Sequence, residues 1–179
     1  MNGPLLSLDR TDLKILDILQ TDGRISNSRL AELVNLSPTA VMARVQKLTK
    51  DEFILGYEAK LNPVKLNANF LVFVEVLLDK TTPNVLDEFI DAVVHYPEIV
   101  ECHMVSGGFD FLIKLRSGSM EEFRRIAGQV LWQLPGVKET RSYPVMQVVK
   151  DSSKIKIKTK INKGPKPLCL FSMSYVLSL

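Results

Sequence analysis

Residues 26–50, SNSRLAELVNLSPTAVMARVQKLTK, decide the fold of the N-terminal part of this chain. Ser26 is a good cap for a short helix, and Asn35-Leu36 breaks the apolar pattern that follows it. Ser37-Pro38 then offers a second cap before a proline at the first helical position, where its missing N–H costs nothing. Three- and four-residue spacing predicts two helices joined by a tight turn, with inward faces formed by Leu30, Leu33 and Val34 and by Val41, Val45 and Leu48.

A further helix is predicted upstream of this pair. Asp9 can cap it, and Asp12 in its first turn favours the positive end of the helix dipole. Asp22-Gly23 ends it with a residue that tolerates positive φ. The N-terminal third is therefore predicted to be a three-helix unit containing a helix-turn-helix.

The third helix, from Pro38 to about Lys50, has an outer face that its own core does not use. In a helix-turn-helix this is the helix that enters the major groove of DNA. Arg44 can bond guanine bidentately or clamp a phosphate, and Gln46 can pair with adenine. Thr39 offers a methyl and a hydroxyl, and the lysines suit phosphates. The candidate DNA-binding residues are Ser37, Pro38, Thr39, Ala43, Arg44, Gln46, Lys47 and Lys50.

Charge gives this interpretation little support. The chain has a net charge of +3, but residues 1–61 are neutral and the positive excess lies in residues 150–179. Net charge is therefore poor evidence for nucleic-acid binding here. From spacing alone, a small three-helix domain with an ordinary solvated surface stays an open alternative.

The remainder alternates strand and helix patterns. Residues 53–61 begin like a turn and then alternate, which predicts a hinge strand, and Asn62-Pro63 marks a domain boundary. The order after it is β-α-β-β-α-β, a ferredoxin-like sandwich in the α+β class whose open sheet face needs a partner. The expected elements are strands at 70–78, 99–105, 109–116 and 137–149, with helices at 83–96 and 119–134.

These patterns predict three regions: a DNA-binding unit at 1–61, an αβ-sandwich at 62–150, and a tail at 151–179. The tail is first basic and then apolar, and residues 154–161 alternate as an edge strand would. Residues 168–179 are mostly apolar but far too few to span a bilayer. We interpret the tail as a disordered extension; non-specific attraction to DNA and packing on a neighbouring subunit are the alternatives.

The turn Ser106-Gly107-Gly108-Phe109-Asp110 is a candidate effector site. Glycine lets backbone N–H groups approach a carboxylate, and Asp110 can attract an ammonium group; together these needs describe an α-amino acid. Thr140, Arg141 and Ser142 on the last strand are weaker candidates to line the same site. The alternative is a plain β-hairpin, for which Gly-Gly is a common turn.

Other function classes find no support. Cys102-His103 lacks neighbouring ligands or a partner base, and strand geometry puts the two side chains on opposite faces. No zinc spacing, carboxylate pair or phosphate-binding loop occurs, so we expect no metal, no cofactor and no enzyme. Two distant cysteines, with no export signal and no membrane-spanning stretch, indicate a protein of the reducing cytoplasm.

Several motifs together resemble the leucine-responsive/AsnC (Lrp/AsnC) family of prokaryotic transcriptional regulators. The resemblance runs from about Leu8 to Ile157, and the tail departs from it. The matching stretches, in order, are LDRTDLKIL (8–16), DGR (22–24), LAELVNLSPTAV (30–41), RVQKL (44–48), ILGYEA (54–59), GGFDF (107–111) and LPGV (134–137).

The resemblance implies a winged helix-turn-helix joined by a hinge strand to an effector-binding (RAM/ACT-like) αβ-sandwich. It also implies dimers formed through the sheets, their assembly into octamers or related discs, and small amino acids bound between sandwich domains. We therefore expect a sequence-specific regulator that binds double-stranded DNA and responds to an amino acid. The alternative is a metabolite-binding sandwich whose N-terminal helices serve assembly only.

Overall fold

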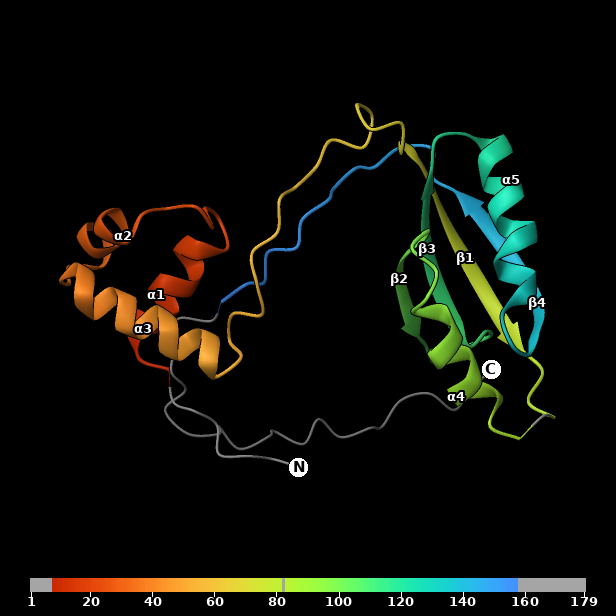
Figure 1. Cartoon of the computed structure of the whole chain (residues 1–179), viewed down its shortest axis with the longest axis horizontal. Helices are drawn as coiled ribbons and strands as arrows, with labels where there is room; N and C mark the ends of the chain where they lie inside the picture. The colour runs from red at the N-terminus through yellow and green to blue at the C-terminus, as the bar shows by residue number, and fades with distance from the viewer. Residues whose placement is uncertain (1–7, 82, 158–179) are drawn as a thin grey trace, which may run out of the picture. The chain divides into compact units, whose positions relative to one another are not determined.

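The computed structural model describes residues 8–81 and 83–157 (Figure 1). The described residues form two compact units, one of residues 8–58 with 152–157 and one of residues 59–151. The first unit holds α1 (Arg10–Leu19), α2 (Asn27–Val34) and α3 (Pro38–Lys50). The second holds β1 (Phe70–Leu78), α4 (Val85–Val93), β2 (Ile99–Met104), β3 (Phe111–Ser117), α5 (Met120–Gln129), the 3₁₀ turn η1 (Leu131–Gln133) and β4 (Val137–Pro144).

Each helix of the first unit begins at its predicted cap. The Asp9 carboxylate accepts the Asp12 N–H while the Asp12 carboxylate accepts the Asp9 N–H, which is a complete capping box. Ser26 and Ser37 accept backbone N–H groups three residues ahead. Asn35 ends α2 in the left-handed region, at φ 57°. These caps fix where α2 stops and where α3 starts.

The three helices share one apolar core. Its buried members come from all three helices, and the prediction for α2 was wrong at one position, because Leu33 is 37% exposed and Ala31 is buried instead. The turn after Val34 sets the rotation of α2 so that Leu30, Ala31 and Val34 point inward. The core consists of Ile15, Leu30, Ala31, Val34, Val41 and Leu48.

The predicted hinge strand at 53–61 is not formed, and neither is a β-wing among the described residues of this unit. A strand needs a ladder of backbone hydrogen bonds with a neighbour, and the described part of this unit holds no other strand to supply one. Tyr57 instead lies against Gly23, where an added Cβ would come within 2.8 Å of the ring. A side chain at position 23 would displace that ring.

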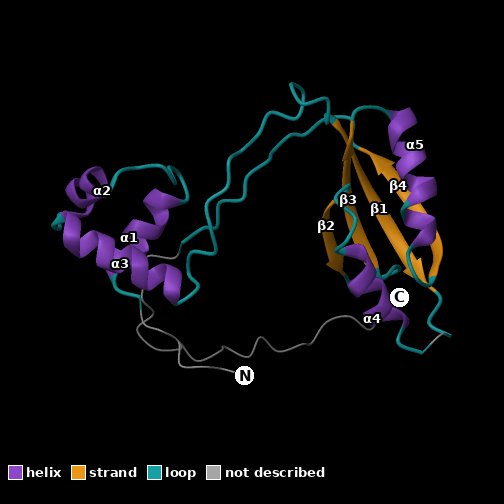
Figure 2. Cartoon of the chain, viewed as in Figure 1, coloured by secondary structure: helices purple, strands orange, loops and turns teal. Residues whose placement is uncertain are grey.

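The second unit is a four-stranded antiparallel sheet in the order β2-β3-β1-β4, with α4 and α5 on one face (Figure 2). Alternate residues of β1 and β3 point toward the helices, because successive side chains of a strand face opposite sides. Phe89 of α4 stacks on Phe111 of β3 with ring centroids 4.4 Å apart. The core also includes Val72, Val74, Val76, Ile113, Leu115, Phe123 and Ile126.

Several elements are shorter than the sequence patterns predicted. β4 ends at Pro144, which has no N–H to continue the ladder, rather than at residue 149. Residues 154–157 are not a strand, and the rest of the stretch predicted as an edge strand, 158–161, lies outside the described residues. Gly136 lies directly before β4 and adopts φ +67°, a conformation that favours glycine. Val85 is so close that a Cβ added at position 136 would lie 1.9 Å from its side chain.

Candidate DNA-binding and effector sites

The outer face of α3 carries one continuous stripe of exposed side chains. Thr39, Ala43, Gln46 and Lys50 recur at intervals of four, three and four residues, so they share one side of the helix. Lys47 is exposed beside them, and Ser37 and Pro38 are exposed at the start, with the Ser37 hydroxyl engaged in the cap. The inward side is taken by Val41 and Leu48.

Sequence reasoning missed Met42, which is 44% exposed on the border of the same stripe. The signal was available, because Met42 follows Thr39 by three residues and precedes Gln46 by four. A flexible apolar side chain at this place can contact a thymine methyl group.

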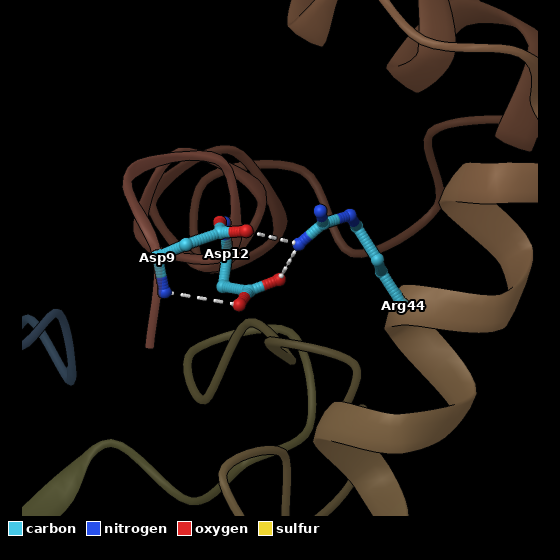
Figure 3. A network of polar contacts seen from close by, with 3 residues as sticks. All are labelled: Asp9, Asp12 and Arg44. Atoms are coloured by element: carbon cyan, nitrogen blue, oxygen red, sulfur yellow. Dashed lines mark hydrogen bonds and ion pairs between the residues drawn. The ribbon is translucent and has the colours of Figure 1, made fainter. Parts of the chain in front are cut away.

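Arg44 does not join the stripe. Its Nη1 lies 2.6 Å from Asp9 Oδ2 and 2.7 Å from Asp12 Oδ1, so the side chain reaches from α3 to the capped start of α1 (Figure 3). The hydrogen bonds that the Arg44 guanidinium donates to the two carboxylates raise its pKa, and the bond to Asp12 contributes most. In this structure Arg44 therefore fixes α3 against α1. Nothing in the sequence pairs Arg44 with residues more than thirty positions away.

The same network makes the first unit sensitive to acid. The Asp12 backbone N–H, followed by the Arg44 guanidinium, lowers the pKa of Asp9 below its usual value of about 3.9. A carboxylate with a lowered folded pKa contributes stability that is full above the unfolded pKa and is lost as pH falls through the folded one. Its share therefore begins to be lost below about pH 4 and is gone once the pH is below the lowered pKa of Asp9.

We expect Asp9→Asn to flatten this acid dependence. Asparagine caps a helix about as well as aspartate, so the cap stays while the charge is lost. Urea unfolding of the first unit between pH 6 and pH 3 measures the effect, with Asp17→Asn as an exposed control on the same helix. An equal loss of stability on acidification in Asp9→Asn and the wild type would show that Asp9 is not the responsive group.

The turn between β2 and β3 holds Ser106, Gly107 and Gly108 exposed and Phe109 half-buried. Neither glycine has a positive φ among the described backbone angles, and a Cβ on either would meet nothing within 4 Å. The backbone of this turn therefore does not itself require glycine at these positions. One physical reason for glycine remains: without a side chain, the backbone can be approached closely by a molecule outside the chain.

Both carboxylate oxygens of Asp110 have partners within the chain. One carboxylate oxygen accepts the Leu78 N–H at 2.9 Å, and the other lies 2.6 Å from the Lys80 ammonium. Burial opposes ionisation, but the Lys80 and Leu78 hydrogen bonds outweigh it and lower the pKa of Asp110. The ammonium group beside this carboxylate is thus that of Lys80, whereas a ligand's ammonium group was predicted there. Through the Leu78 N–H, Asp110 also joins the start of β3 to the end of β1.

A small hollow of about 50 Å³ lies beside the turn, on the sheet face opposite the helices. Thr140 and Ser142 do not reach it, since they pair with Val76 and Val74 on the helix-facing side of the sheet. The lining residues of the hollow are Glu75, Leu77, Gly108, Phe109, Glu139 and Arg141.

Cys102 and His103 lie on opposite faces of β2. The Cys102 side chain packs against the helix-side core, and burial raises the pKa of its thiol. His103 Nε2 lies 3.3 Å from Glu101 Oε2. The helices that the structure describes include none with the length and apolar character to cross a membrane.

A helix-turn-helix followed by a one-sided αβ-sandwich is the domain arrangement of a class of DNA-binding regulators with a ligand-binding domain. Comparison with family models identifies the family within this class. The AsnC-type helix-turn-helix domain model matches residues 8–49, and the Lrp/AsnC ligand binding domain model matches residues 71–155. The chain belongs to the Lrp/AsnC family of transcriptional regulators. The predicted family, fold class and regulatory function are confirmed.

Relatives cover nearly the whole chain. The leucine-responsive regulatory proteins of Klebsiella pneumoniae and Escherichia coli K12 are each 49% identical over 157 residues, 88% of this chain and 96% of theirs. A Neisseria meningitidis transcriptional regulator in complex with L-methionine superposes with a TM-score of 0.80, at 29% identity over 84% of this chain and 97% of that one. An Agrobacterium tumefaciens AsnC family regulator gives 0.78 at 30% identity, over 83% and 97%.

Proposed function

We propose that this chain binds double-stranded DNA sequence-specifically through the outer stripe of α3. The observation that carries the proposal is the stripe itself, in which Thr39, Ala43, Gln46 and Lys50 share one exposed side of a helix capped at Ser37. Gln46 is placed to pair with adenine, and Lys47 and Lys50 in the last turns suit phosphates. Arg44 is assigned a positioning role, holding α3 through Asp9 and Asp12.

Equilibrium binding of the full chain to duplexes from its own upstream region tests this proposal. A scrambled duplex of equal length is the reference, because phosphate attraction alone does not discriminate between sequences. Preference for an upstream duplex supports a regulator. Equal and feeble affinity for both at low salt favours the rival, a metabolite-binding sandwich whose helices serve assembly only.

We further propose that an α-amino acid binds at the turn 106–109. Open space over Gly107 and Gly108 supports close approach of a carboxylate to their backbone, and Leu77 and Phe109 add apolar surface. The hollow is far smaller than an ordinary ligand pocket of several hundred Å³. The site is therefore completed by a second copy of the chain. Relatives named for leucine, and one solved with L-methionine, favour an amino acid with an apolar side chain.

Gly108→Val is expected to abolish the response to this effector without unfolding the chain. The new side chain meets nothing within its own chain but occupies the space that the ligand needs. Thermal unfolding with a panel of amino acids measures the response, and Gly128→Ala, also in open space but on α5, is the control. A variant that keeps the wild-type shift would place the effector elsewhere.

The open face of the sheet supports self-association. It presents the half-buried Phe73, Leu77 and Leu112 among charged side chains, whereas α4 and α5 cover only the other face. We propose a dimer through this face, assembling further into octamers or related discs in the cytoplasm, with no catalytic activity of its own. Gel filtration of the full chain with and without amino acids measures the assembly, and a monomer at all concentrations would contradict it.

A further inference from the structure

The chain that leaves the sandwich returns to the helix-turn-helix unit and is held on the end of α1. The Gln20 side chain donates from Nε2 to the Ile155 carbonyl at 3.1 Å and accepts the Ile155 N–H on Oε1 at 3.0 Å. Lys154 Nζ donates to Thr21 Oγ1 at 3.2 Å. We call residues 152–157 the returning strap.

The anchor of this strap is specific and prearranged. A carboxamide that binds both backbone groups of one residue acts as a strand neighbour would, and it fixes the direction of the bound segment. Gln20 Nε2 also lies 3.1 Å from Asp17 Oδ1, which orients the amide. Three residues further on, Gly23 receives the ring of Tyr57. The corner formed by residues 20–23 thus receives both the outgoing chain and the returning strap.

The strap changes the charge of the DNA-binding unit. Residues 8–58 contain seven basic and eight acidic residues, a net charge of −1. The strap contributes Lys154 and Lys156 and no acidic residue, so that the described unit becomes +1. Both lysines are exposed, and the backbone bonds at Ile155 fix the strap between them.

The corner also precedes, by one short loop, the helix that is expected to face phosphates. The first helix of a helix-turn-helix crosses the DNA backbone, and helix N-termini bind phosphate oxygens. Here that helix is α2, whose cap Ser26 follows Gln20 by six residues along a short loop. A basic segment anchored on this loop can therefore reach the same backbone.

We infer that the returning strap is an accessory DNA-contacting element, whose lysines 154 and 156 bind phosphates while Gln20 holds the strap on α1. This inference rests on the proposed DNA binding and deepens it. Contacts of this kind are independent of sequence, so they strengthen binding to every duplex and steepen its salt dependence.

The test measures the affinity of the full chain for its upstream duplex and for a scrambled duplex from about 50 to 200 mM salt. The double variant Lys154→Ala, Lys156→Ala is expected to weaken binding to both duplexes by the same factor and to reduce the salt slope by about 1 per lysine. The matched control replaces the exposed sandwich lysines Lys65 and Lys138, and is expected to keep the wild-type slope. Gln20→Ala keeps both lysines but releases the strap, and is expected to change the slope in the same direction.

The outcomes separate the two proposals. Wild-type protein that shows no preference for the upstream duplex overturns the proposed function, and this inference with it. Wild-type preference with an unchanged slope in the double-lysine variant overturns the strap alone. A reduced slope in that variant, with wild-type behaviour of Gln20→Ala, overturns the docked arrangement, because the lysines would then act without the anchor.

Discussion

Ala43→Glu is expected to weaken binding to the upstream duplex by at least about 100-fold while leaving the fold intact. Ala43 is exposed at the middle of the α3 stripe, between Thr39 and Gln46, so the new carboxylate points away from the core. In the bound state it would face bases and phosphates, and juxtaposed like charges at an interface cost several kcal/mol. Fluorescence anisotropy with the labelled duplex measures the change, at one fixed salt concentration.

The control for this variant is Gln133→Glu, which makes the same change of charge at an exposed position of η1 in the other unit. It is expected to bind within a factor of about two of the wild type, because exposed charges at a distance are screened by salt. Circular dichroism checks that Ala43→Glu keeps its helices. A folded Ala43→Glu protein with wild-type affinity would exclude this face of α3 from the DNA interface.

Phe89→Ala is expected to lower the free energy of unfolding of the sandwich unit by about 3–5 kcal/mol. Phe89 is fully buried at the centre of the core, stacked on Phe111, and truncating it removes apolar contacts and leaves a cavity. Urea unfolding at one fixed protein concentration measures the loss, because assembly makes stability depend on concentration.

Ile90→Ala is the matched control, since Ile90 is the next residue of α4 and is 39% exposed. It is expected to cost less than about 1 kcal/mol, as substitutions away from the core usually do. Similar losses in both variants would mean that α4 does not pack through Phe89. A folded sandwich in Phe89→Ala with unchanged stability would contradict the core described here.

Patterns among residues close in sequence predicted the order of the helices and strands of this protein. Ser26, Ser37 and Pro38 fixed the start of α2 and α3, because capping depends only on residues close in sequence. Alternation and helical spacing gave the order of strands and helices, and an open sheet face followed from it. The stripe of α3 could be listed for the same reason, with Met42 overlooked.

Long-range pairs were beyond the reach of these rules. Arg44 was assigned to DNA, yet its guanidinium binds Asp9 and Asp12, which lie over thirty residues earlier. Asp110 was assigned to a ligand ammonium, and Lys80 occupies it in the chain. Both assignments failed to foresee these partners because a charged side chain takes whichever opposite charge the fold brings near, and spacing says nothing about that.

The hinge strand fails for a related reason. Residues 53–61 alternate as a strand does, but alternation specifies a face and not a neighbour, and a strand forms only with a partner ladder. The strap escaped sequence reasoning as well. Its lysines were visible as charge, whereas its anchor at Gln20 joins residues 135 positions apart.

Photo-crosslinking can show whether DNA lies against the outer stripe of α3. A photoreactive amino acid replaces Met42 on the border of the stripe or, as the control, the exposed Gln133 of η1 in the sandwich unit. Each full-length protein is irradiated with the upstream duplex under conditions where the wild type is saturated. We expect an efficient crosslink from position 42 and little from position 133; a crosslink from position 133 that equals or exceeds that from position 42 would show that DNA does not lie against the α3 stripe.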